Sequence, residues 1–244
     1  MDKFITDKIR ITCENLKELS KTVVYEVPEL KCIPSEYKKT NEFPSVDSTW
    51  KSFERNERVN GKDKHFWFYT ELKTPPAKEN KYYTLEVITG SDGMWDAINP
   101  QGLLYLNGKI IQGIDVNHRQ AVLEPDTEYK IMLYFYVGMI DKHIEVMMNV
   151  NEIDIPVKDL YYDMQVPYEA TLCFDSKDYI HIKTLKHLEQ ACNRIDFRGD
   201  KNEAFYKSIA DAREYLKKEY FEKIRCREIC NIKNKLERIE SASL

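Results

Sequence analysis

The sequence has no long apolar run. Its first residues carry a charged side chain every few positions, which argues against both a signal peptide and a membrane-spanning helix. We therefore expect a cytoplasmic protein with no membrane partner. The six cysteines form no CxxC pair, and no histidine stands near them at the spacing of zinc ligands. Without a secretion signal, free thiols are expected, and no metal site is predicted in this chain.

Neither sign of charge dominates. The 244 residues include 37 Lys and Arg against 41 Asp and Glu, for a formal net charge of −4. This balance gives no electrostatic reason to expect nucleic acid as a partner. A hydrophobic fraction of 42% and a charged fraction of 32% are ordinary for a globular protein and exclude a largely disordered one.

The familiar catalytic motifs are absent as well. The sequence has no GxSxG elbow, no P-loop and no GxGxxG, and its five histidines include no pair spaced to share a metal ion. Carboxylates such as Asp92 and Asp115 are near one another in sequence, as a glycosidase pair would need, but Asp in turns more often bonds its own backbone. No catalytic residue is predicted, and no activity is expected from this chain alone.

What the chain does have is a series of short β-like segments, separated by Gly, Pro, Asn and Asp. The predicted strands cover residues 64–72, 81–89, 103–106, 109–113, 120–123, 128–137, 143–150 and 169–174. In residues 128–137 both alternating faces are apolar, which is typical of a central strand covered on both sides. Because no helix interrupts the series, we expect a mainly β fold, an antiparallel β-sandwich of the jelly-roll or galactose-binding-like kind.

Helical periodicity flanks the β region. Residues 6–19 predict an N-terminal helix, and three prolines within residues 27–44 indicate a surface linker after it. Beyond residue 183, apolar side chains recur at helical spacing and predict a C-terminal helical segment. The predicted domains are residues 1–44, the helix and linker; residues 45–183, the sandwich; and residues 184–244, a helical connector.

The densest signal lies between Gly90 and His118. Asn107-Gly108 stands between two apolar runs, which predicts a hairpin with a two-residue type I′ turn. Around it are side chains of the types that carbohydrate sites use: an aromatic face for the sugar ring, and amides and carboxylates for its hydroxyls. The candidate carbohydrate-binding residues are Trp95, Asp96, Asn99, Gln101, Asp115 and His118.

Two other interpretations of these features stay open. Trp95 can instead close the end of the core, while Asp115 and His118 satisfy backbone groups; we favour this structural role, because an aromatic residue in a β domain usually packs. The aromatic content, 12% with 16 tyrosines, is also compatible with an apolar surface for a partner or a second copy in a homo-oligomer.

The sequence also resembles a known family. HFWF at residues 65–68, WDAINPQGLLYLNG at 95–108 and QGIDVNH at 112–118 resemble the non-catalytic N-terminal domain of glycoside hydrolase family 38 α-mannosidases, of the bacterial and cytosolic type. The resemblance implies a β-sandwich that supports assembly and flanks the active cleft of a zinc-dependent hydrolase of α-mannosides.

Further expectations follow from this resemblance. The zinc would belong to the catalytic domain of the parent enzyme, whose His-x-His-x-Asp segment this chain lacks, so no cofactor is expected here. The catalytic domain of the same enzyme would be the partner, and it would cover the apolar stripe of residues 185–220. α-Mannoside glycans would be the ligands. The alternative function is a stand-alone, lectin-like carbohydrate-binding module.

Overall fold

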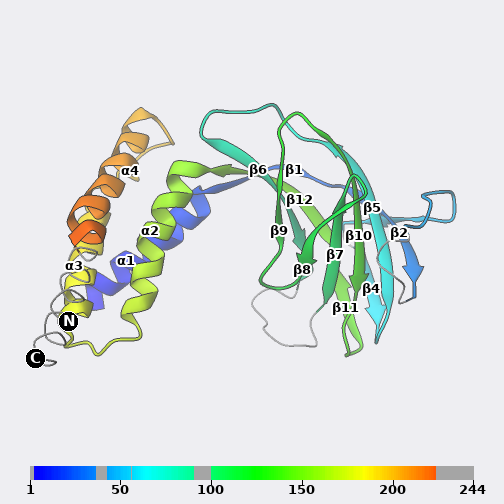
Figure 1. The fold of residues 1–244 in the computed structure, drawn as a ribbon, viewed down its shortest axis with the longest axis horizontal. Helices are drawn as coiled ribbons and strands as arrows, with labels where there is room; N and C mark the ends of the chain where they lie inside the picture. The colour runs from blue at the N-terminus through cyan, green and yellow to red at the C-terminus, as the bar shows by residue number, and fades with distance from the viewer. Residues whose placement is uncertain (1–2, 37–42, 56, 91–99, 224–244) are drawn as a thin grey trace, which may run out of the picture. The chain divides into compact units, whose positions relative to one another are not determined.

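The chain forms two compact units, each with its own apolar core. The computed structural model describes residues 3–36, 43–55, 57–90 and 100–223 (Figure 1). The helical unit combines Met1–Lys21 with Asp154–Leu244, and the β unit is Thr22–Ile153. These boundaries replace the predicted divisions after residues 44 and 183.

The β unit is a sandwich of two sheets, and its sheet orders are non-consecutive. The four-stranded sheet has the order β1 (Lys21–Glu26), β12 (Met147–Asp154), β6 (Lys81–Ile88) and β9 (Gln120–Leu123). The six-stranded sheet has the order β3 (Lys51–Glu54), β2 (Glu29–Ser35), β5 (His65–Lys73), β10 (Glu128–Tyr136), β7 (Gln101–Leu106) and β8 (Lys109–Ile114). β4 (Arg58–Gly61) and β11 (Lys142–Glu145) form a separate pair.

Strand alternation gives the sandwich its core. On β10, Ile131, Leu133 and Phe135 are completely buried, while the residues between them point to the opposite face of the sheet. They share one cluster with inward-facing residues of both sheets, including Phe68, Leu104, Tyr83, Leu85, Met148 and Val150. The predicted mainly β, antiparallel sandwich with flanking helices is therefore confirmed.

The predicted hairpin joins β7 to β8. Asn107 and Gly108 have φ values of 50° and 78°, as a type I′ turn requires. The Asn107 side chain also accepts a hydrogen bond from the Lys130 N–H (2.8 Å) and donates one to the Glu128 carbonyl (3.1 Å). The turn is thereby tied to β10 as well as to its own strands.

Gly102, early in β7, is required by close packing. A Cβ there would lie 2.8 Å from Leu133 Cδ1 and 3.1 Å from the Tyr134 carbonyl oxygen. We expect Gly102→Ala to lower the free energy of unfolding by about 1–3 kcal/mol, because neither a core leucine nor a strand carbonyl can move away easily. Urea denaturation of the purified protein measures this change.

Gly113 on β8 provides the matched control for this prediction. It pairs with Leu103, next to Gly102, yet the nearest atom to an added Cβ is 3.9 Å away. Gly113→Ala should leave stability unchanged or raise it slightly, because alanine restricts the unfolded chain. Equal losses for both variants would contradict the packing argument.

The helical unit is formed by α1 (Lys3–Leu19), α2 (Ile155–Thr171), α3 (Tyr179–Cys192), α4 (Glu203–Tyr215) and the π-helical turn Leu216–Phe221. The side chains of Asp154, Asp178 and Asn202 cap the N-termini of α2, α3 and α4. None of the described helices is both long and apolar enough to cross a membrane.

Two sequence-based assignments were wrong. Residues 169–174 are not a strand, since α2 runs to Thr171; its Pro156 lies in the first turn, where no N–H is needed. Residues 27–44 are not only linker, because they contain β2. Pro34 is compatible with this strand because β3 pairs only as far as Cys32, so the proline has a single neighbouring strand.

The apolar stripe of residues 185–220 is covered within the helical unit itself. Leu185, Leu188, Ile209 and Leu216 are at most 1% exposed and share one core with residues of α1 and α2, such as Ile9. The expectation that a catalytic domain covers this stripe is therefore wrong. α3 and α4 are integral to a packed unit that also contains α1 and α2.

Candidate functional site

Three of the six predicted carbohydrate-binding residues, Trp95, Asp96 and Asn99, lie outside the described residues. Gln101 is an exposed residue at the start of β7, and its neighbour Gly102 pairs with Ile114 at the end of β8. Asp115 follows directly after β8. The structure thus brings Gln101 and Asp115 to the same end of the six-stranded sheet.

The Asp115 carboxylate is engaged by its own turn. It accepts hydrogen bonds from the N–H groups of Asn117 and His118, both at 2.7 Å, and lies 3.0 Å from the His118 Nδ1. Burial alone would raise the pKa of Asp115, but these hydrogen bonds outweigh it and hold this pKa below its ordinary value. These contacts support the structural interpretation of Asp115; a sugar-binding role for Gln101, Asp115 and His118 stays a prediction.

A larger group of aromatic side chains lies on the outer face of the six-stranded sheet, opposite the sandwich core. We call it the aromatic face; its buried members are Trp50, Trp67, Tyr105, Met132 and Tyr134. Strand register brings them together, since Met132 of β10 pairs with Tyr69 of β5 and with Tyr105 of β7. The two apolar faces of residues 128–137 indicated this layer, but not what covers it.

Residues 43–50 cross the aromatic face and cover part of it. The Phe43 ring packs edge-on against Tyr105 (centroids 4.9 Å apart) and Trp67 (6.0 Å). Trp50 packs against Tyr69 (6.2 Å), and its ring N–H donates to the Ser45 carbonyl at 3.0 Å. The segment thus covers part of the aromatic face and adds the aromatic rings of Phe43 and Trp50 to it.

Two grooves flank Phe43. The first, of about 1000 Å³, is called the Tyr69 groove; it is lined by Tyr25, Lys31, Phe43, Tyr69, Glu71 and Lys130, among others. The second, of about 830 Å³, is called the His65 groove; it is lined by Ile33, Glu36, Phe43, Lys64, His65 and Trp67, among others. Each groove therefore combines aromatic walls with charged side chains.

In the Tyr69 groove, an aromatic ring is held in place by a carboxylate. The Tyr69 hydroxyl donates a hydrogen bond to the Glu71 carboxylate two residues along β5. Burial, and then this hydrogen bond, raise the pKa of Tyr69 to about 12, so the phenol stays neutral. Trp50 supports the ring within the same face. A ligand that contacts Tyr69 would therefore meet a preorganised ring.

The His65 ring, which lines the His65 groove, is part of a stack of rings. His65 lies between Tyr134 (centroids 5.5 Å apart) and Tyr136 (5.0 Å), and its Nδ1 is 2.9 Å from the Tyr134 hydroxyl. Tyr136 in turn donates to Asp63 at 2.5 Å. Burial lowers the pKa of His65 below its ordinary value, which Asp63 only partly opposes, so the imidazole is neutral at neutral pH.

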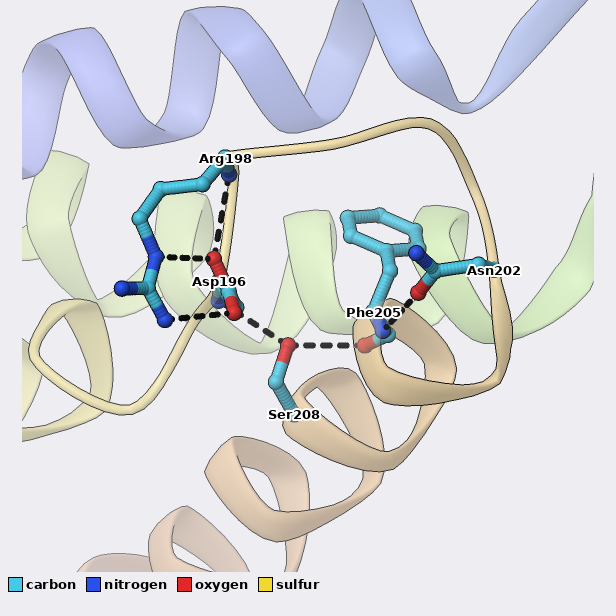
Figure 2. Close-up of polar contacts among 5 residues, drawn as sticks. All are labelled: Asp196, Arg198, Asn202, Phe205 and Ser208. Carbon is cyan, nitrogen blue, oxygen red and sulfur yellow. Dashed lines mark hydrogen bonds and ion pairs between the residues drawn. The ribbon is translucent and has the colours of Figure 1, made fainter.

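The helical unit has a polar cluster between α3 and α4, shown in Figure 2. Arg198 forms two side-chain hydrogen bonds to Asp196, both 2.9 Å, and these lower the pKa of Asp196 to about 2. The Asp196 N–H donates to Ser208 Oγ, which donates to the Phe205 carbonyl, while Asn202 caps α4. These bonds hold the loop onto the first turns of α4, so we assign the cluster a structural role.

No metal centre emerges from the part of the chain that the structure describes. Within it, no three His, Cys, Asp or Glu side chains gather closely enough to hold a metal ion. We take the two grooves on the aromatic face as the candidate functional site, because they combine aromatic walls with charged side chains.

No family model and no curated protein matches the chain. Solved structures that it matches include β-glucuronidases from Ruminococcus gnavus (11% identity, TM-score 0.34, 55% of this chain and 28% of that chain) and Faecalibacterium prausnitzii (7%, 0.37, 55% and 31%). Another is titled a β-glucuronidase from glycoside hydrolase family 2 (13%, 0.35, 56% and 18%). The chain spans less than a third of each of these structures.

The predicted membership of glycoside hydrolase family 38 is wrong. The three matched structures named above are titled β-glucuronidases, not α-mannosidases, and no family model supports the resemblance. The short segments that suggested the family coincide with ordinary features of this sandwich. HFWF belongs to β5, and LLYLNG forms β7 and its turn. The zinc, the α-mannosides and the mannosidase catalytic domain were implied by that resemblance alone and are withdrawn with it.

Proposed function

We propose that the β unit is a non-catalytic carbohydrate-binding module and that its ligand lies in the Tyr69 groove. The observation that carries the proposal is the lining of this groove. Tyr25, Phe43 and Tyr69 offer aromatic surface beside the charged groups of Lys31 and Glu71. Tyr25 is 44% exposed and Phe43 39%, so both rings are accessible to a ligand.

These residue types suit a sugar for two reasons. The apolar face of a sugar ring packs against an aromatic ring, while its hydroxyl groups need hydrogen-bond partners, which ammonium groups and carboxylates provide. A groove that buries much of a small ligand and combines apolar walls with a few polar groups is the usual form of a binding site. Because Tyr69 is held by Glu71 and supported by Trp50, little side-chain entropy is lost on binding.

Replacing Tyr69 tests this function. A panel of neutral and acidic glycans is first screened against the purified chain, and the binding constants of those that bind are measured by calorimetry. Tyr69→Ala should weaken binding at least about tenfold, equivalent to about 1.4 kcal/mol, because the stacking surface is lost. Tyr69→Phe keeps the ring and should remain within a few-fold of the parent.

Tyr162→Ala on α2 is the matched control, since this tyrosine is 51% exposed and lies in the helical unit. It should bind like the parent. Failure of every glycan to bind the parent, or equal binding by Tyr69→Ala, would contradict the proposed function. The expected cytoplasmic location and the homo-oligomer stay predictions.

A further inference from the structure

Both grooves follow the same two strands, which indicates one elongated site. On β5, residues 65–67 line the His65 groove, and residues 69–71 line the Tyr69 groove. On β2, residues 33–35 line the His65 groove and residues 29–31 line the Tyr69 groove. Because β2 and β5 pair side by side, the grooves lie in line along the strands, on either side of Phe43.

The length of this line exceeds a single sugar ring. His65 and Glu71 are six residues apart on β5, and a strand rises by about 3.3 Å per residue, so the two ends are separated by about 20 Å. Outward-facing residues between them are Trp67 and Tyr69, both within the aromatic face. A monosaccharide in either groove would leave the other one empty.

Phe43 connects the two grooves instead of closing them off. Its ring lines both, and it is 39% exposed although it packs edge-on against Trp67 and Tyr105. An accessible aromatic ring at the junction offers a stacking surface for a sugar unit between the two ends.

The charges of the grooves oppose a strongly anionic ligand. Lys31 and Lys130 in the Tyr69 groove are balanced by Glu29 and Glu71, and the His65 groove contains Lys64 and Glu36. His65 adds no charge at neutral pH, because its imidazole is neutral. A polyanionic chain would meet as many carboxylates as ammonium groups, whereas a neutral chain can use both as hydrogen-bond partners.

We propose that the ligand is a neutral, linear oligosaccharide or polysaccharide that lies along β5, with sugar units in both grooves and across Phe43. This inference rests on the proposed function and specifies its ligand class. It requires affinity to increase with chain length until the ligand reaches from Glu71 to His65.

The experiment measures affinity against chain length with the full chain. The probes are cello-, xylo- and β-1,4-manno-oligosaccharides of one to six units, with a heparin hexasaccharide as the charged control. For at least one neutral series, the hexasaccharide should bind at least about tenfold more tightly than the disaccharide, and the heparin fragment should bind more weakly.

Two variants assign the gain in affinity with chain length to the His65 groove. His65→Ala should weaken the hexasaccharide about tenfold and leave the disaccharide unchanged, whereas Tyr69→Ala should weaken both. His65 packs between tyrosines, so its replacement could also disturb the fold. The His65 imidazole NMR signal of the unmodified protein therefore provides a second measurement, which should shift with the hexasaccharide and not with the disaccharide.

The outcomes separate the two proposals. Glycan binding that does not depend on length, or tighter binding of the heparin fragment, overturns this inference and leaves the proposed function standing. If none of the three series binds but another glycan of the panel does, the inference is likewise overturned and the proposed function stands. No binding to any glycan overturns both.

Discussion

Trp67→Ala is expected to lower the free energy of unfolding of the β unit by about 3–5 kcal/mol. Trp67 is 4% exposed, and its ring packs against Tyr134 (centroids 5.1 Å apart), Tyr105 (5.7 Å) and Phe43 (6.0 Å). Truncation would leave a large void beneath residues 43–50 and remove the layer on which Phe43 rests. Hydrogen exchange of β5 and β10, together with urea denaturation, measures the loss.

Val122→Ala is the control for this prediction. Val122 lies on β9 in the other sheet and is 63% exposed, so its truncation should change stability by less than about 0.5 kcal/mol. Since the two units have separate cores, protection of α3 should change little in the Trp67 variant. A Trp67→Ala protein with the stability of the parent would show that the aromatic face contributes no packing energy.

Sequence reasoning predicted the sandwich because its signals are local. Alternation along residues 128–137 reflects the two faces of β10. Asn107-Gly108 predicts its turn because these two residue types readily adopt the positive φ values of a type I′ turn. α2 was missed because it contains Pro156 and Pro167, which interrupt a helical pattern although one lies in the first turn. β2 was missed because Pro34 marks a break in most strands.

The candidate site could not be predicted in the same way, because it depends on contacts between distant segments. His65, Trp67 and Tyr69 share one face by alternation, which the sequence shows. Phe43 covers Trp67, and β2 lies beside β5. Both contacts join segments that are dozens of residues apart along the chain. The predicted binding residues lay instead within residues 95–118. Of these, Asp115 accepts hydrogen bonds from the N–H groups of its own turn.

The division into units was also beyond the sequence. Ile9 of α1 shares a core with Leu160 of α2 and Leu185 of α3, although the whole β unit separates α1 from α2 along the chain. Periodicity identifies the buried side of each helix but not the helix that it packs against. A connector toward another domain and a self-contained helical unit therefore have the same sequence pattern.

Asp154→Ala is expected to lower the free energy of unfolding of the helical unit by about 3 kcal/mol. Asp154 is 2% exposed and precedes α2, where its carboxylate caps the Val157 N–H. It also accepts a hydrogen bond from the Tyr206 hydroxyl (2.7 Å) and lies 3.7 Å from the Lys201 ammonium. Removing the carboxylate thus leaves a half-buried hydroxyl, a helix terminus and a half-buried cation without this partner.

Two further variants divide this loss among the contacts. Tyr206→Phe removes only the hydroxyl hydrogen bond and should cost about 1 kcal/mol. In Asp154→Asn, the single amide oxygen can keep the cap on the Val157 N–H, but Tyr206, which donates to the other carboxylate oxygen, would face the amide nitrogen, and the charge beside Lys201 is lost. Because the NH2 group can still donate to the Tyr206 hydroxyl, this variant should fall between the other two. Hydrogen exchange of α2 and α4 localises the effect, and protection of β10 should be nearly unchanged because it belongs to the other core. If Asp154→Ala destabilised no more than Tyr206→Phe, the carboxylate would be acting only through that hydroxyl, and its roles as cap and counter-ion would be refuted.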